Sequence, residues 1–153
     1  MNLNEVAIAL EHRLDGPCGF VDFLAMTWQC SHVRFVRGLW DADDYSREET
    51  LAWILKRGDE DYKDNWNDSL LHSHCRAVPI AEIASSIDAL TKEIENSDHV
   101  ANPLPLPIRH SDLTNIVMPV SIQGLALYDY GPTAVYVWQR QSEFNYLEIH
   151  YES

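Results

Sequence analysis

Basic residues are scarce in this sequence. Its 153 residues hold 11 Lys and Arg against 24 Asp and Glu, which gives a formal net charge of −13 at pH 7. A surface this negative disfavours unassisted binding to nucleic acid and to anionic membranes, because both are polyanions. It favours a basic protein partner and speeds the encounter with one at low salt. We therefore expect a basic protein partner, no direct nucleic-acid contact and no membrane contact.

Long apolar runs and cysteine pairs are also missing. No apolar run approaches the roughly 18 residues that a membrane-spanning helix needs. The first residues include no basic segment, and Glu5 and Glu11 interrupt the apolar ones, which is not the pattern of a signal peptide. Cys18, Cys30 and Cys75 are odd in number and widely spaced, which suits reduced thiols better than a disulfide framework. The expected compartment is the cytoplasm.

Catalytic and cofactor-binding signatures do not occur either. The sequence has no G-x-S-x-G nucleophile elbow and no glycine-rich loop of the kinds that hold phosphates. His110, Ser111 and Asp112 are triad residue types, but adjacent side chains diverge, so a solvated turn explains them better. Cys18 has no partner motif and fits a turn that ends a helix. The sequence thus predicts a protein that is not an enzyme and has no cofactor.

One group of residues could bind a metal ion. His72, His74 and Cys75 are suitable ligand types, and Cys30 and His32 could complete a site. On a helix, however, His72 and His74 point to different faces. A polar helix end with a half-buried cysteine is the simpler interpretation, and we predict no metal site.

Apolar spacing predicts helices in the first two-thirds of the chain. Ser46 and Glu49 form a capping box that starts one of them, and Lys56 and Arg57 suit its last turn. Leu51, Ile54 and Leu55 should face inward on that helix. The segment around Val33 and Val36 favours a strand instead. The expected helices are residues 3–14, 20–28, 47–57, 59–74 and 80–94. Asn2 or Asn4 should cap the first helix, and Gly16-Pro17 should end it. Gly58 should follow the third helix, and Pro79 should lie in the first turn of the last.

The last third changes character. Pro103, Pro105 and Pro107 forbid a helix and favour an extended connector. Branched and aromatic residues then predict short strands at residues 116–122, 125–130, 133–139 and 146–152. We expect one α+β domain over residues 1–153, with a mainly helical part (1–100), a connector (101–110) and strands (111–153). In this fold a helix-rich N-terminal two-thirds packs on an antiparallel meander of roughly three to four strands, with its apolar face against the 80–94 helix.

The most unusual stretch is the acidic, aromatic run at residues 41–68. It holds ten carboxylates against four basic residues, with Tyr45, Trp53, Tyr62 and Trp66 among them. Interface hot spots favour Tyr and Trp, and surrounding carboxylates pair with Arg and Lys of a partner. Alternatively, Trp53 and Trp66 are core residues and the acids only keep the protein soluble. The predicted partner-binding residues are Asp41, Asp43, Asp44, Tyr45, Asp59, Glu60, Asp61, Tyr62, Asp64, Trp66 and Asp68.

This profile, small, acidic, cytosolic and without catalytic motifs, resembles that of bacterial immunity proteins. The resemblance implies a binding-only inhibitor that docks its acidic-aromatic face on a basic, nuclease-type toxin and occludes the active site. One alternative is a DNA-mimic inhibitor of a defence enzyme. Another is a small α+β enzyme or ligand-binding domain, with a pocket between sheet and helices lined by Tyr128, Tyr130, Trp138 and His150. A third is an adaptor whose proline segment at residues 103–107 is read by a partner.

Overall fold

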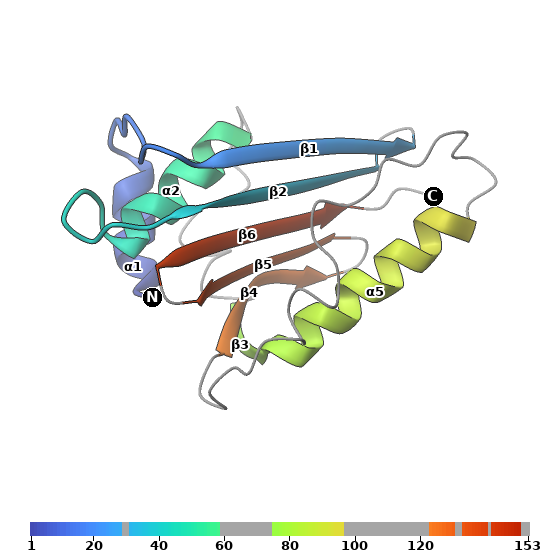
Figure 1. Ribbon diagram of the computed structural model, residues 1–153. Helices are drawn as coiled ribbons and strands as arrows, with labels where there is room; N and C mark the ends of the chain where they lie inside the picture. The colour runs from blue at the N-terminus through green and yellow to red at the C-terminus, as the bar shows by residue number, and fades with distance from the viewer. Residues whose placement is uncertain (29–30, 59–74, 97–122, 131–132, 141, 151–153) are drawn as a thin grey trace.

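An antiparallel sheet dominates the protein. The computed structural model describes residues 1–28, 31–58, 75–96, 123–130, 133–140 and 142–150. Within them, six strands form a single sheet in the order β1-β2-β6-β5-β4-β3 (Figure 1). The strands are β1 (Val21–Trp28), β2 (Ser31–Leu39), β3 (Arg76–Pro79), β4 (Gln123–Tyr130), β5 (Thr133–Arg140) and β6 (Glu143–His150). The helices are α1 (Leu3–Leu10), α2 (Arg47–Gly58) and α5 (Ile80–Asn96).

The predicted fold class, a helix-rich front on a meander of a few strands, is therefore wrong. Residues 20–28 were expected to be helical, but most of them form β1, which pairs antiparallel with β2. Spacing alone does not distinguish helix from strand in a short apolar run. Here the extended form sets Phe23 opposite Phe35 on one face and Asp22 opposite Val36 on the other. β2 and β3 also join the sheet, so half of its strands come from the part expected to be mainly helical.

Several other predictions are confirmed. The 47–57 helix is α2, the 80–94 helix is α5, and the last three strands lie close to their expected positions. Two bounds are corrected, because α1 ends at Leu10, well before Gly16, and Pro79 closes β3 rather than opening the helix. The helix expected at 59–74, the connector at 101–110 and the strand at 116–122 lie outside the described residues.

The sheet is covered on both faces, because successive strand side chains point to opposite sides. Phe35, Tyr136 and Leu147 belong to one apolar cluster, into which α5 places Ile83, Ala84 and Ile87 as expected. Val36, Val137 and Tyr146 belong to the other, which includes buried residues of α1 and α2. The sheet therefore lies between α5 on one face and the α1–α2 pair on the other.

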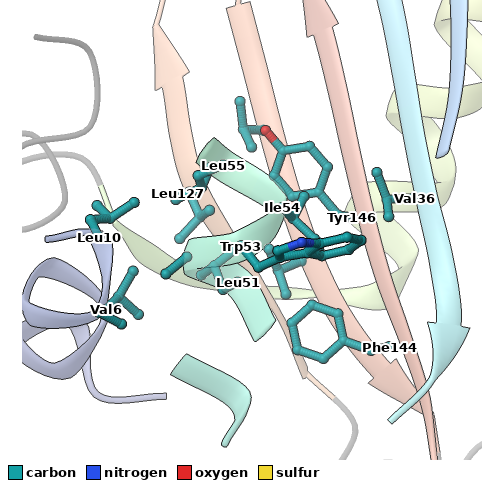
Figure 2. Packing of buried hydrophobic residues seen from close by; sticks show 14 residues of the cluster. Val6, Leu10, Val36, Leu51, Trp53, Ile54, Leu55, Leu127, Phe144 and Tyr146 are labelled. Atoms are coloured by element: carbon teal, nitrogen blue, oxygen red, sulfur yellow. The ribbon is translucent and has the colours of Figure 1, made fainter. Parts of the chain in front are cut away.

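Trp53 of α2 lies in the second cluster, among Leu51, Ile54, Phe144 and Tyr146 (Figure 2). Its side chain is almost completely buried, and its ring meets Phe20 edge-on at 5.9 Å between centroids. Edge-to-face contacts of this kind add to the stabilisation from apolar burial. The core interpretation of Trp53 is thus confirmed, and this residue is not part of a binding face.

The two helices on this face run side by side in the same direction. Near their N-termini, the Asn2 backbone N–H donates to the Glu48 carboxylate at 2.7 Å. Near their C-termini, the Lys56 ammonium donates to the His12 carbonyl. Each contact places a charge where the helix dipole favours it. Asn2 also caps α1, because its side-chain oxygen accepts from the backbone N–H of Asn4 and Glu5.

The predicted capping box of α2 is present. The Ser46 hydroxyl accepts from the Glu49 backbone N–H at 3.0 Å, and the Glu49 carboxylate accepts from the Ser46 backbone N–H at 3.4 Å. Leu51, Ile54 and Leu55 are all buried, as expected. The start of α2, directly after the acidic residues at 41–44, is therefore fixed by local chemistry.

Replacing Ser46 by Ala should lower the free energy of unfolding by about 1 kcal/mol, because the Glu49 N–H loses its acceptor. Chemical denaturation of native and variant chains measures this difference. Ser85→Ala is the control, since its hydroxyl only bonds back to the Ala81 carbonyl inside α5. If the two substitutions had equal effects, the stabilising role assigned to the cap would be refuted.

Candidate acidic binding surface

Residues 41–44, named here the acidic turn, join β2 to α2 in a defined conformation. The Asp41 carboxylate accepts from the Asp43 backbone N–H at 2.9 Å. The Asp41 carbonyl accepts from the backbone N–H groups of Asp44 and Tyr45 at 3.2 and 3.1 Å. Aspartate favours this type of turn because its short side chain reaches the backbone two residues on. Asp41, Asp43 and Asp44 are all exposed, so the turn presents its carboxylates to solvent.

Contacts of Trp40, the residue before the acidic turn, hold the turn in its conformation. Its indole Nε1–H donates to the Tyr45 carbonyl at 2.9 Å, which closes the turn from one end to the other. Its backbone N–H donates to the Ser142 carbonyl at 2.6 Å, next to β6. The guanidinium of Arg47 lies 5.1 Å from the centroid of the Trp40 ring. Because these contacts order the turn in advance, a partner would not have to order it on binding.

The acids at the start of α2 have a different role from those of the turn. Glu48 accepts from Asn2, and Glu49 accepts from Ser46. Both carboxylates are thus used in helix-start contacts, as the capping pattern indicates. In the described connection between β2 and α2, the exposed carboxylates are those of Asp41, Asp43 and Asp44.

The structure brings together four of the predicted partner-binding residues. Asp41, Asp43, Asp44 and the half-buried Tyr45 form one continuous feature between β2 and α2. The remaining ones lie outside the described residues: Asp59, Glu60, Asp61, Tyr62, Asp64, Trp66 and Asp68. Their part in binding stays a prediction.

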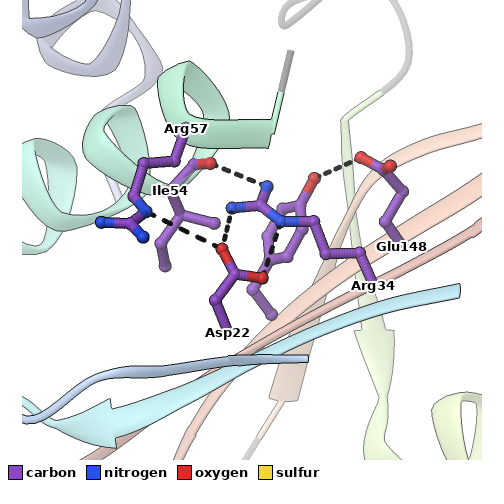
Figure 3. Close-up of polar contacts among 6 residues, drawn as sticks. Asp22, Arg34, Ile54, Arg57 and Glu148 are labelled. Carbon is purple, nitrogen blue, oxygen red and sulfur yellow. Dashed lines mark hydrogen bonds and ion pairs between the residues drawn. The ribbon is translucent and has the colours of Figure 1, made fainter. Parts of the chain in front are cut away.

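An ionic cluster that was not predicted from the sequence lies around Arg34, beside the end of α2 (Figure 3). Arg34 of β2 is only 4% exposed. Its Nε and Nη2 atoms donate to the two Asp22 carboxylate oxygens at 3.1 and 2.7 Å, and Nη1 donates to the Ile54 carbonyl at 2.8 Å. The arginine therefore links β1, β2 and α2. A signal was available in the sequence, because Arg34 interrupts an apolar strand, but its partner depends on the pairing of β1 with β2.

Tyr146 extends this cluster to β6. Its ring lies 5.5 Å from the Arg34 guanidinium, and its hydroxyl donates to the Glu148 carboxylate at 2.7 Å. Burial, together with the negative charge of Glu148, raises the pKa of Tyr146 well above its usual value, so the phenol stays protonated and donates. Burial lowers the pKa of Arg34, but the hydrogen bond to Asp22 and nearby acids outweigh it and raise that pKa overall. Both groups hold fixed protonation states, which suits a structural role better than proton transfer.

The residues proposed to line an enzymatic pocket do not converge. Tyr128 packs against the cluster on the α1–α2 face, whereas Trp138 is buried in the cluster on the α5 face. Residues on opposite faces of a sheet cannot line one pocket, so that arrangement is wrong. His150 lies with its Nδ1 2.7 Å from the Thr133 hydroxyl. The Tyr130 side chain lies outside the described part.

The candidate metal ligands are only partly described. His72, His74 and Cys30 lie outside the described residues, and Cys75 is half-buried. Within the described ranges, no group of three or more His, Cys, Asp or Glu is arranged to hold a metal ion. Burial raises the pKa of the Cys75 thiol.

The two described cysteines should therefore differ in reactivity. Cys18 is exposed, whereas Cys75 is half-buried, with its pKa raised by burial. Because the thiolate is the reacting form, iodoacetamide near pH 8 should alkylate Cys18 before Cys75. Peptide mass spectrometry over a time course measures both sites in one sample. Faster alkylation of Cys75 would contradict the described environments, and equal rates in denaturant serve as the control.

Comparison with protein-family models, with curated proteins and with solved structures found no match for this chain. In the described ranges, the helices are too short or too polar for any of them to cross a membrane. The geometry and charge of the acidic turn are thus the main observations that bear on function.

Proposed function

We propose that this protein is a binding-only inhibitor that neutralises a basic, nuclease-type toxin in the cytoplasm, in the manner of an immunity protein. One observation carries the proposal: Asp41, Asp43 and Asp44 are exposed on a turn that the Trp40 contacts hold in place. An ordered group of carboxylates is suited to recognising Arg and Lys side chains, because charge-assisted hydrogen bonds are strong and directional.

The charge of the whole chain supports the same role. A net charge of −13 attracts a basic protein over the distance within which salt does not screen the field, and this attraction raises the association rate. A nuclease binds a polyanion, so its substrate groove carries basic residues. An acidic turn seated in such a groove would compete with the phosphate backbone for those residues. Inhibition of this kind needs no reaction on the inhibitor, which agrees with a sequence free of catalytic motifs.

The test begins with identification of the partner. The purified chain is immobilised and exposed to lysate of its source cells at low salt, and bound protein is eluted with a salt gradient. We expect a basic protein to elute at moderate salt, because ion pairs at a protein surface are screened. The eluted protein is then assayed for nuclease activity with and without the free chain. We expect the free chain to abolish that activity in proportion to its amount.

Two results would overturn the proposal. One is a specific partner that is acidic or neutral and resists high salt. The other is a basic partner whose nuclease activity does not change when the chain is bound. Urea-unfolded chain on the same support controls for simple ion exchange, because it carries the same charges without the ordered turn.

A further inference from the structure

Two exposed apolar side chains lie at the same end of the sheet as the acidic turn. Leu39 at the end of β2 is 75% exposed, and Val21 at the start of β1 is 69% exposed. Among the described residues, these are the two most exposed large apolar side chains. The structure thus leaves apolar surface uncovered beside the proposed binding site.

Leu39 and Val21, named here the apolar pair, are neighbours across the antiparallel pair of β1 and β2. Val21 lies opposite Arg37, so Leu39 is its diagonal neighbour two residues further on. Such diagonal positions are about 7–8 Å apart, within reach of one partner side chain. By strand alternation both lie on the face that carries Phe23 and Phe35. The pair therefore forms one small apolar site.

The charges around the apolar pair favour a basic partner. The neighbouring Arg37 is already engaged, because its Nε donates to the Asn145 side-chain oxygen at 2.7 Å and lies 3.5 Å from the Glu143 carboxylate. The acidic turn begins at Asp41, two residues after Leu39. A ligand on Leu39 would therefore lie beside exposed carboxylates. This charge complementarity indicates which kind of segment fits.

Building on the proposed function, we propose that the partner presents a segment in which one apolar side chain is flanked by Arg or Lys. The apolar side chain docks on Leu39 and Val21, and the basic ones pair with Asp43 and Asp44. Isolated exposed apolar residues are normal on protein surfaces, and Ile8 of α1, 60% exposed, is an example. The apolar pair differs from Ile8 because two such residues adjoin an ordered acidic turn, as the apolar centre and charged rim of an interface do.

Two synthetic peptides test this proposal with the full chain. They have equal positive charge and the same length, and differ only in a central Leu or Ser between Arg residues. Each is titrated into isotope-labelled chain while backbone amide signals are followed by NMR. We expect the Leu peptide to bind about tenfold more tightly, the ratio that one well-placed apolar anchor gives. The largest shifts should fall on the ends of β1 and β2 and on the acidic turn.

Leu39→Ser should remove the preference for the Leu peptide, whereas Ile8→Ser should retain it. Both side chains are exposed, so circular dichroism and the thermal midpoint should match those of the native chain, which excludes misfolding as the cause. Equal binding of the two peptides to the native chain would overturn the proposal. So would an absence of binding by both peptides, or a preference that survives in Leu39→Ser.

The two proposals fail in different ways. Equal binding of the two peptides to the native chain, with an affinity that still falls in salt and in Asp43→Asn/Asp44→Asn, overturns the apolar pair alone. If neither added salt nor the double substitution changes the affinity for the peptides, the electrostatic site is overturned, and the proposed function with it.

Discussion

Replacing Asp22 by Ala is expected to lower the free energy of unfolding by about 3 kcal/mol, because it leaves the Arg34 guanidinium buried without its carboxylate. Arg34 is almost fully buried, and Asp22 accepts two of the three hydrogen bonds described for its guanidinium. Urea denaturation followed by circular dichroism measures the loss. Arg34→Met should cost less, since the remaining Asp22 side chain is partly accessible and lies 4.0 Å from Arg57.

The double variant Asp22→Ala/Arg34→Met makes this prediction sharper. Replacing both partners of a buried ion pair by apolar residues often changes stability little. The double variant should therefore be more stable than Asp22→Ala alone. The surface pair of Asp88 and Lys92 on α5, 3.2 Å apart, provides the control. Asp88→Ala should change stability by less than about 0.5 kcal/mol. Additive effects of the Asp22 and Arg34 substitutions would show that the pair is not coupled.

Gly16→Ala should also destabilise the chain strongly, by about 3 kcal/mol in total. The backbone at Gly16 has φ of +89°, which L-residues with a side chain rarely adopt. An added Cβ would lie 2.2 Å from Nε1 of Trp53, and this indole is held by Phe20 on one side and Arg57 on another. The methyl group therefore displaces either the turn or the centre of the α1–α2 core.

Gly19→Ala separates the cost of the unfavourable backbone conformation from the cost of the contact with Trp53. Gly19 has a similar φ of +78°, but an added Cβ would meet nothing within 4 Å. This variant should lose only the backbone contribution, about 1 kcal/mol. Thermal unfolding of both variants measures the difference. Equal losses at the two positions would mean that the contact between Gly16 and Trp53 does not limit stability.

Local chemistry was readable from the sequence, and strand partnership was not. The capping box of Ser46 and Glu49 involves residues three apart, and the apolar stripe of α5 repeats within one segment, so each is fixed by near neighbours. β1 depends instead on β2, and β2 depends on β6, where Val36 lies opposite Tyr146 from the other end of the chain. The strand count failed because these pairings are non-local.

The candidate site shows the same division. The carboxylates of the acidic turn were predictable, because a run as polar as residues 41–44 cannot be buried. The closing contact from Trp40 to the Tyr45 carbonyl joins residues only five apart, but it follows no sequence motif that could have predicted it. The diagonal of Val21 and Leu39 appears only once β1 and β2 lie side by side. The Asp22–Arg34 pair was missed for the same reason.

If the proposed function is right, the acidic turn, and not net charge alone, binds the basic partner. The direct test compares Asp43→Asn/Asp44→Asn with Glu11→Gln/Asp15→Asn, in which two other exposed acids are neutralised. Asp41 stays in place in both variants because its carboxylate shapes the turn. Each variant carries two fewer negative charges than the native −13.

The affinity of each variant for the captured basic partner is measured by calorimetry over a range of salt concentrations. We expect the turn variant to lose at least about tenfold in affinity and much of its salt dependence, while the control variant stays close to the native chain. Equal affinities for the two variants at every salt concentration would contradict this expectation.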